Sequence, residues 1–234
     1  MVSDVEEGLI RLATALDKQD MIGFTNLFVD NIISGQESVN RDLLPWITDI
    51  DKKWTGVIFL GMGGSAAGGD FISALADYDG SIPVKCCRGY ELPHWWTTDW
   101  LVVATSYSGN TEETLSACEQ AINQNATVVV ISSGGILSGM CELSDSVYLI
   151  SCPGGQPPRS AFGHIFSRQL SLMIEIGILH TELSDSATKR LQDAIEDSNI
   201  IIHPEGDVAS LALNMTKNPI AILGPNELLS LIHI

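Results

Sequence analysis

Short, mostly apolar runs alternate with longer amphipathic segments between residues 55 and 150. The runs have the length of strands, and a strand that is apolar throughout is typically covered on both faces. Strands are predicted near 56–60, 82–87, 100–105, 126–131 and 146–150, and helices near 65–78, 111–124 and 136–142. Strands that alternate with helices are typical of a parallel sheet with helices on both faces. The pattern therefore predicts an α/β fold with a five-stranded parallel sheet.

The segments on either side of this region are predicted to be mainly helical. Residues 3–50 place Leu9, Leu12 and Leu16 on one helical face, and we expect these helices to pack on the sheet or on a partner subunit. Further helices are predicted near 161–180, 184–199 and 206–217. After Asn218 and Pro219, an apolar run at 220–224 resembles the first strand and its glycine turn.

We therefore expect four segments along the chain. These are a helical segment at 1–50, a first α/β domain at 51–182, a helical linker at 183–217 and the start of a second α/β domain at 218–234. The last residues, LSLIHI at 229–234, resemble the translation of a common sequencing adapter. The chain is accordingly expected to be a fragment that is cut short within its second domain.

The composition excludes several classes of function. The 234 residues have a net charge of −17, whereas a nucleic-acid-binding surface needs a basic footprint. No stretch of about 18 uncharged apolar residues occurs, so no membrane span is expected. The acidic N-terminus lacks the basic region of a signal peptide, so we expect a cytoplasmic protein without nucleic-acid or membrane partners.

The five cysteines are predicted to be reduced thiols. They include no CxxC pair, and the chain shows no secretory signal. Cys86 and Cys87 are neighbours in a predicted strand and therefore point to opposite faces, which makes them poor partners for a metal. We expect small buried apolar side chains here, and the sequence indicates neither a metal site nor a cofactor.

Two turns rich in glycine and serine each follow an apolar strand and open a helix. They are GMGGS at 61–65 and SYSGNT at 106–111. The carboxyl ends of strands form the ligand crevice of an open α/β sheet, and a helix N-terminus there favours anions. Glycines let the backbone approach closely, and hydroxyl groups add donors. The two turns together predict a phosphate site, although either turn alone is also typical of a helix cap without a ligand.

A loop rich in proline and glycine, SCPGGQPPRS at 151–160, precedes a predicted helix. Its rigid prolines place Arg159 just before the helix, where a guanidinium can bind a phosphate, a sugar oxygen or a developing oxyanion. The alternative is an ordinary surface ion pair. Ser160 is predicted to cap the helix, and His164 and His180 are expected on that helix in structural roles.

These motifs, with PPRSAFG at 157–163, resemble the bifunctional phosphoglucose/phosphomannose isomerase family. The resemblance is good over 55–180 and weak at 219–224. It implies two sugar isomerase (SIS) domains, each a five-stranded parallel sheet flanked by helices in flavodoxin-like layers. It also implies a homodimer whose active site forms between domains and subunits.

The resemblance implies a role for each candidate residue in the two turns. Ser106, Ser108 and Thr111 would bind the phosphate of a sugar 6-phosphate. Gly64 and Ser65 would hold the sugar end. Room beside Thr111 would admit both glucose 6-phosphate and mannose 6-phosphate, which the family converts to fructose 6-phosphate in glycolysis and gluconeogenesis.

Arg159 would stabilise the enediolate-like intermediate, but proton transfer between C1 and C2 also needs a base. The family takes a glutamate from its second domain, a ring-opening histidine from the partner subunit and a lysine from near its C-terminus. Glu227 lies only three residues after the Gly224 turn, so it does not match that glutamate. The fragment is therefore expected to bind a sugar phosphate without turnover.

Three other interpretations stay open at this stage. The protein could be another SIS enzyme, such as an amino-sugar phosphate isomerase or a phosphoheptose isomerase. It could be a non-catalytic module that senses a sugar phosphate through a partner. In the third interpretation, the glycine turns serve the topology of the sheet only.

Overall fold

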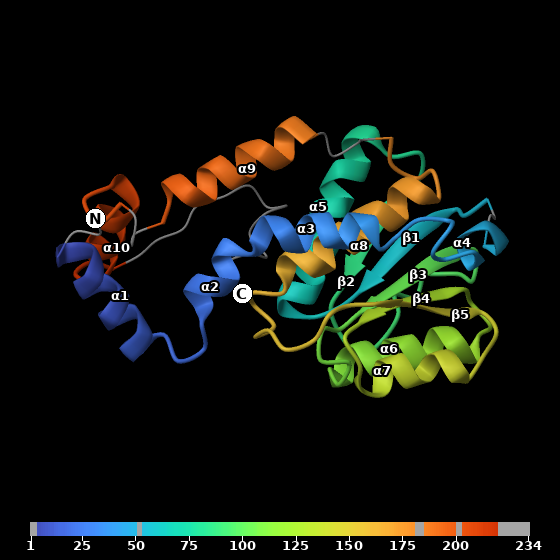
Figure 1. Cartoon of the computed structure of the whole chain (residues 1–234). Helices are drawn as coiled ribbons and strands as arrows, with labels where there is room; N and C mark the ends of the chain where they lie inside the picture. Colours follow the sequence, from blue (N-terminus) through green and yellow to red (C-terminus); the bar gives the residue numbers. More distant parts are fainter. Residues whose placement is uncertain (1–3, 51–52, 181–184, 200–202, 220–234) are drawn as a thin grey trace. The chain divides into compact units, whose positions relative to one another are not determined.

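The structure is a computed structural model that describes residues 4–50, 53–180, 185–199 and 203–219. The described residues fall into two compact units (Figure 1). Those up to Val29 and those from Asp185 onward form a helical unit. Those from Asp30 to His180 form a second unit, the sheet unit, which is built around the β-sheet. The predicted domain start at 218–234 lies almost entirely outside the described residues, as do the adapter-like residues 229–234.

All five strands of the sheet unit are parallel and lie in the order β2-β1-β3-β4-β5. They are β1 (Gly56–Leu60), β2 (Val84–Cys87), β3 (Trp100–Thr105), β4 (Val128–Ser132) and β5 (Val147–Ser151). Every residue of β1 and β4 is buried, as the continuous apolar runs predict. The α/β fold and its five parallel strands are therefore confirmed.

Helices cover both faces of this sheet (Figure 1). Alternate residues such as Ile58 and Val102 point to the face that is covered by α6 (Glu112–Asn123) and α7 (Gly135–Gly139), where a short turn of 3₁₀ helix, η1 (Met140–Glu142), follows. Phe59 points to the other face, against α5 (Gly63–Asp79), and α5 packs on α8 (Phe162–Glu175). The sheet is thus the middle one of three layers.

Residues 30–50 pack on the sheet unit, which is one of the two positions predicted for the N-terminal helices. They hold most of α3 (Phe28–Glu37) and the short α4 (Trp46–Asp49). The ring of Trp46 stacks on Tyr148 of β5 with a centroid distance of 4.8 Å. Arg41 donates a hydrogen bond to the carbonyl of Glu175 at the end of α8. These contacts place residues 30–50 within the fold of the sheet unit.

Helix α8 ends at Glu175, earlier than the predicted residue 180. Gly177 adopts a left-handed backbone with φ of 72°, and its N–H bonds to the carbonyl of Ile174. The N–H of Ile178 bonds back to Met173. This pair of hydrogen bonds is the Schellman motif, which closes a helix at a glycine. The prediction that His180 lies on the helix is therefore wrong, and its backbone N–H instead bonds to Asp79.

The helical unit contains the first part of the helical segment predicted at 3–50 and the helices predicted near 184–199 and 206–217. They are α1 (Asp4–Leu16), α2 (Met21–Asn26), α9 (Asp185–Asp197) and α10 (Asp207–Met215). No residue of α2 or α10 is buried. The described residues of this unit are therefore mostly exposed helix surface.

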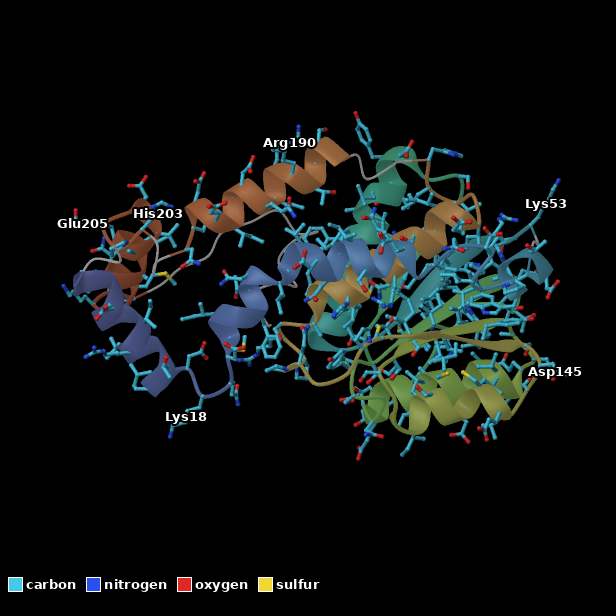
Figure 2. All side chains as sticks on the ribbon, viewed as in Figure 1. Lys18, Lys53, Asp145, Arg190, His203 and Glu205 are labelled. Carbon is cyan, nitrogen blue, oxygen red and sulfur yellow. The ribbon has the colours of Figure 1, made fainter. Side chains whose placement is uncertain are left out.

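Polar side chains lie on the outside of both units. Figure 2 labels six exposed examples, which are Lys18, Lys53, Asp145, Arg190, His203 and Glu205. None of the helices in the described ranges combines the length and the apolar character that crossing a bilayer would require.

Candidate functional site

A pocket of about 290 Å³ lies at the carboxyl ends of β1 and β3. Its lining residues are Met62, Gly63, Gly64, Ser65, Tyr107, Ser108, Thr111, Pro158 and Arg159. The chain leaves β1 toward the β2 edge and then returns to β3 on the other side, so β1 and β3 flank the point where the winding reverses. Such a switch point is where open α/β sheets bind ligands. The volume is near the lower end of the range of small-molecule sites, about 300 Å³.

The pocket brings together five of the six predicted site residues from three separate segments. They are Gly64 and Ser65 from the start of α5, Ser108 and Thr111 from the second turn, and Arg159 from the loop before α8. Right-handed crossovers deliver all of these segments to the same edge of the sheet. The predicted juxtaposition of the two turns is therefore present in the structure.

Ser106 is the one predicted site residue that does not line the pocket. Its side chain is buried, with 1% of the residue exposed. Its hydroxyl lies 2.9 Å from the hydroxyl of Thr111 and accepts a hydrogen bond from the N–H of Gly109. Ser106 therefore supports the loop from behind, and its hydroxyl contacts that of Thr111, a residue that lines the pocket.

The second turn is supported by the loop that follows β4. Gly109 has a left-handed φ of 69°, and a side chain there would overlap the carbonyl oxygen of Gly134. The carbonyl of Gly109 accepts a hydrogen bond from Leu137, and the side chain of Asn110 accepts one from Ile136. Two loops thus pack backbone to backbone, and only glycine fits at Gly109.

Helix α6 begins directly after this turn, at Glu112. The first turn of a helix has N–H groups without partners inside the helix, and its dipole favours a negative charge. Glu112 and Glu113 lie in this first turn, as predicted. Ser108 and Thr111 line the pocket next to this helix start, so the arrangement favours an anion with several oxygen atoms.

Tyr107 lines the pocket, although the sequence analysis did not select it. It is 5% exposed, and burial raises the pKa of its phenol above the usual value of 10.0. The phenol donates a hydrogen bond to the carbonyl of Pro153 and accepts one from the N–H of Gln156. Tyr107 stands inside the SYSGNT motif, so its position in that motif was the available signal. Its partners lie 46 and 49 residues away, beyond the range of any local pattern.

Arg159 is exposed and is the only charged residue among those that line the pocket. In the part of the chain that the structure describes, the ion pairs are Arg11–Glu7, Arg41–Glu175 and Arg88–Asp70, and Arg159 takes part in none of them. The alternative of a surface ion pair is therefore not observed within the described residues. The pocket has a local positive charge in a chain whose net charge is −17.

Ser160 does not cap α8, contrary to the prediction. The N-cap residue is Ala161, and no side chain caps the helix. The hydroxyl of Ser160 instead donates to the carbonyl of Pro157 at 2.9 Å. Ser160 therefore closes a local turn around Pro158 and Arg159.

A buried polar cluster lies at the start of α8. His164 is 5% exposed, and its two ring nitrogens lie 3.3 Å from the side-chain nitrogen of Gln156 and 3.4 Å from the guanidinium of Arg168. Burial, and then the charge of Arg168, lower the pKa of His164 below its usual 6.5. Arg168 donates to the carbonyl of Ser151. Side chains of its own unit therefore hold His164, as a structural role predicts.

The described residues contain no group of three or more His, Cys, Asp or Glu side chains that could hold a metal ion. All five cysteines are free thiols. Cys118 and Cys152 are buried as predicted, whereas Cys86, Cys87 and Cys141 are only partly buried. Burial raises the pKa of Cys118 to about 12 and that of Cys152 to about 11, so both stay protonated near neutral pH.

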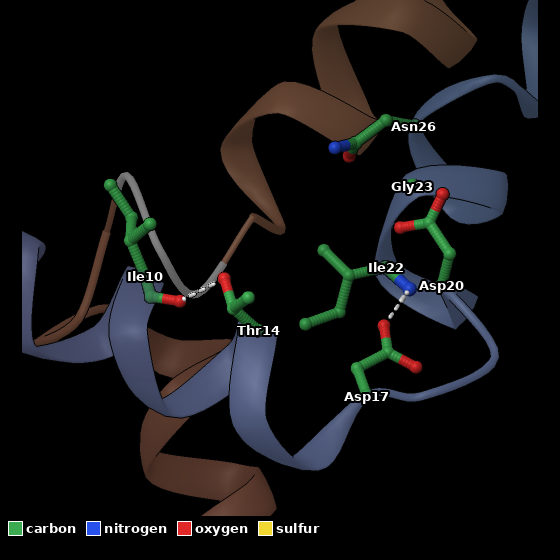
Figure 3. Close-up of a pocket in the computed structure, with 7 residues that line it drawn as sticks. All are labelled: Ile10, Thr14, Asp17, Asp20, Ile22, Gly23 and Asn26. Carbon is green, nitrogen blue, oxygen red and sulfur yellow. Dashed lines mark hydrogen bonds between the residues drawn. The ribbon is translucent and has the colours of Figure 1, made fainter.

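The helical unit has a pocket of its own, in which Asp17 and Asp20 lie near Thr14 and Asn26 (Figure 3). Both carboxylate oxygens of Asp17 accept backbone N–H groups, from Met21 and Ile22 at the start of α2. Asp17 therefore serves as a local helix cap. None of the residues that line this pocket is a lysine or an arginine, whereas Arg159 lines the pocket at the sheet edge.

Comparison with known proteins agrees with this site. No family model matches the chain. A bifunctional phosphoglucose/phosphomannose isomerase of Caldicellulosiruptor bescii is 40% identical over 131 residues, which are 56% of this chain and 37% of that protein. One from Aquifex aeolicus is 34% identical over 161 residues, 68% of this chain and 46% of that protein. The matched part of this chain belongs to the bifunctional phosphoglucose/phosphomannose isomerase family.

The chain spans less than half the length of these two family members, 37% and 46%. The fold agrees with a solved structure as well. The C-terminal domain of glucosamine-fructose-6-phosphate aminotransferase from Francisella tularensis superposes with a TM-score of 0.56 and 14% identity, over 85% of this chain and 58% of that chain. This likeness concerns the fold alone, and it confirms the SIS type of α/β fold.

Proposed function

We propose that the pocket at the sheet edge binds a hexose 6-phosphate. The observation that supports this most directly is that Arg159, which forms no ion pair with the described residues, shares a pocket with Ser108, Thr111 and a helix N-terminus. In this proposal Ser108 and Thr111 donate hydrogen bonds to the phosphate, which lies at the first turn of α6. Gly64 and Ser65 contact the sugar, and Ser106 orients Thr111.

We further propose that the whole protein is an aldose–ketose isomerase. It would interconvert glucose 6-phosphate or mannose 6-phosphate with fructose 6-phosphate by moving a proton between C2 and C1 through an enediol(ate). The guanidinium of Arg159 would stabilise the negative charge that develops on the enediolate oxygen. The family to which the matched residues belong supports this reaction.

The same geometry suggests that the 234-residue chain binds this substrate but does not turn it over. Proton transfer between carbons needs a base within hydrogen-bonding reach. None of the described residues that line the pocket is an aspartate, glutamate, histidine or lysine. In our proposal the base is a glutamate of a second domain, and the histidine that opens the sugar ring comes from the partner subunit of a homodimer.

Titration calorimetry of the 234-residue chain with fructose 6-phosphate, fructose and inorganic phosphate tests the site. We expect fructose 6-phosphate to bind and unphosphorylated fructose not to bind. Arg159→Gln should lower the affinity for fructose 6-phosphate by about 10-fold or more, because it removes charge-assisted hydrogen bonds. Ser108→Ala should lower the affinities for fructose 6-phosphate and for inorganic phosphate by about 5- to 10-fold, because it removes one hydrogen bond.

Matched substitutions in the helical unit serve as controls. Arg190 and Ser210 are exposed and lie on α9 and α10, so Arg190→Gln and Ser210→Ala should leave both affinities unchanged. Equal binding of fructose 6-phosphate by the Arg159 variant and the parent chain would contradict the proposed site. Conversion of fructose 6-phosphate to glucose 6-phosphate by the chain alone would contradict the proposed lack of turnover. Glucosamine 6-phosphate and sedoheptulose 7-phosphate as further ligands test the other SIS substrates.

A further inference from the structure

Tyr107 connects the two ends of the candidate pocket. We infer that Tyr107 is a positioning residue whose hydroxyl fixes the loop of residues 153–159 and thereby holds Arg159 at the pocket. The expected effect of Tyr107 on ligand binding rests on the proposed function of the pocket. Its effect on the path of the loop does not, because it follows from the hydrogen bonds of the phenol.

The phenol hydroxyl makes two hydrogen bonds to one loop. It donates to the carbonyl of Pro153 at 2.9 Å and accepts from the N–H of Gln156 at 3.1 Å. Both partners are backbone groups, so the contact fixes the path of the chain rather than one side chain. Because Tyr107 is 5% exposed, water competes little for these bonds.

The bond to Gln156 lies only three residues before Arg159, and both intervening residues are prolines. Proline fixes φ near −65°, so Pro157 and Pro158 leave the chain little freedom between Gln156 and Arg159. No ion pair involving Arg159 occurs in the described ranges. The place of its guanidinium therefore depends on the path of its loop.

The backbone of Tyr107 is in turn fixed to the first pocket turn and to the loop that follows β4. Its N–H donates to the hydroxyl of Ser65 at 3.3 Å, and its carbonyl accepts from the hydroxyl of Ser133 at 2.6 Å. Tyr107 also lies between Ser106 and Ser108 in the second turn. One residue thus sets the spacing between the phosphate end of the pocket and the arginine end.

Loss of the hydroxyl should loosen the arginine loop without unfolding the sheet unit. The loop keeps a separate attachment at its start, because the N–H of Cys152 bonds to the carbonyl of Ser132. Tyr107→Phe keeps the ring and its burial. The substitution therefore separates the two hydrogen bonds of the phenol from the packing of the ring.

Hydrogen exchange of the ligand-free chain tests the first step. In Tyr107→Phe we expect the amides of residues 154–156, 159 and 160 to exchange about 10-fold faster, as the loss of a hydrogen bond to the Gln156 amide predicts. The matched control is Tyr78→Phe, because Tyr78 is 96% exposed. Unchanged exchange in Tyr107→Phe would overturn the inference, whatever the pocket binds.

Binding tests the second step. Tyr107→Phe should weaken the binding of fructose 6-phosphate about 5- to 10-fold. The affinity for inorganic phosphate should change less than about 2-fold, because only the sugar phosphate reaches Arg159. In an Arg159→Gln background the same substitution should have no further effect on fructose 6-phosphate. If the role of Tyr107 were purely structural, Tyr107→Phe would instead lower the affinities for both ligands, in the parent chain and in the Arg159→Gln variant.

The two proposals fail in different ways. If the parent chain binds neither fructose 6-phosphate nor inorganic phosphate, the proposed function is wrong, and the exchange experiment alone decides the role of Tyr107. If the parent chain binds and Tyr107→Phe exchanges faster but binds fructose 6-phosphate equally well, the inference is overturned and the proposed function stands.

Discussion

The sheet unit and the helical unit differ in how they use their apolar residues. In β1 and β3 the apolar side chains are almost fully buried, and Val57, Phe59 and Leu101 are at most 1% exposed. In the helical unit Leu16 of α1 is 72% exposed and Leu211 of α10 is 59% exposed. The sheet unit therefore makes a core from its own sequence, whereas the amphipathic helices expose apolar surface within the described residues. Helical periodicity alone predicts a helix but does not predict what covers it.

The largest expected effect is a truncation in the core of the sheet unit. Phe59→Ala should lower the free energy of unfolding of that unit by about 3–5 kcal/mol, because it leaves a cavity beside α5. All five tryptophans lie between residues 46 and 100, so tryptophan fluorescence during urea unfolding reports on the sheet unit.

The matched substitution in the helical unit is Leu211→Ala. It should change the free energy of unfolding by no more than about 0.5 kcal/mol, because the side chain is already exposed. Circular dichroism at the helix band during urea unfolding measures this effect. A loss for Leu211→Ala as large as that for Phe59→Ala would break the comparison, since it would mean that α10 buries its apolar face in solution.

Two left-handed glycines within the sheet unit sharpen the comparison further. Gly109→Ala should destabilise by more than about 2 kcal/mol, since it adds a clash with Gly134 to a left-handed backbone cost of about 1–2 kcal/mol. Gly177→Ala meets nothing within 4 Å and should show only the backbone cost. Fluorescence-detected urea unfolding compares the two variants. Equal losses would contradict the close packing of the two loops at the pocket.

The smallest expected effect concerns pH and His164. Its pKa in the folded sheet unit lies below 6.5, so the folded unit disfavours the protonated ring. The unfolded chain then binds more protons than the folded chain as the pH falls below about 6.5, and the stability of the unit decreases. Asn31, Gln156 and Arg168 face the ring and contribute no carboxylate that would offset this.

His164→Gln should flatten this acid dependence between about pH 7 and pH 5 in fluorescence-detected urea unfolding. The exposed His94 provides the control, and His94→Gln should leave the slope as it is in the parent chain. An unchanged slope in His164→Gln would show that the ring already titrates at its ordinary pKa in the folded unit.

The sequence by itself determined the local structure and most of the site. Mostly apolar runs predicted all five strands, and the runs of β1 and β4 are apolar enough to be covered on both faces of the sheet. The glycine and serine turns after β1 and β3 predicted four residues that line the pocket, and the proline-rich loop after β5 predicted a fifth, Arg159, because parallel strands deliver their carboxyl ends to one edge. The end of α8 was also within reach of the sequence, since Gly177 is a local stop signal.

Only the tertiary structure decided which residues face the pocket and which support it. Ser106 lies behind Thr111, whereas Tyr107 reaches Pro153 and Gln156 across the site. Likewise, the sequence left open whether residues 30–50 pack on the sheet, and contacts such as Trp46 on Tyr148 settle that question. The physical reason is the same in each case. Periodicity and turn chemistry act over a few residues, whereas these contacts join loops that come together only when the whole sheet has formed.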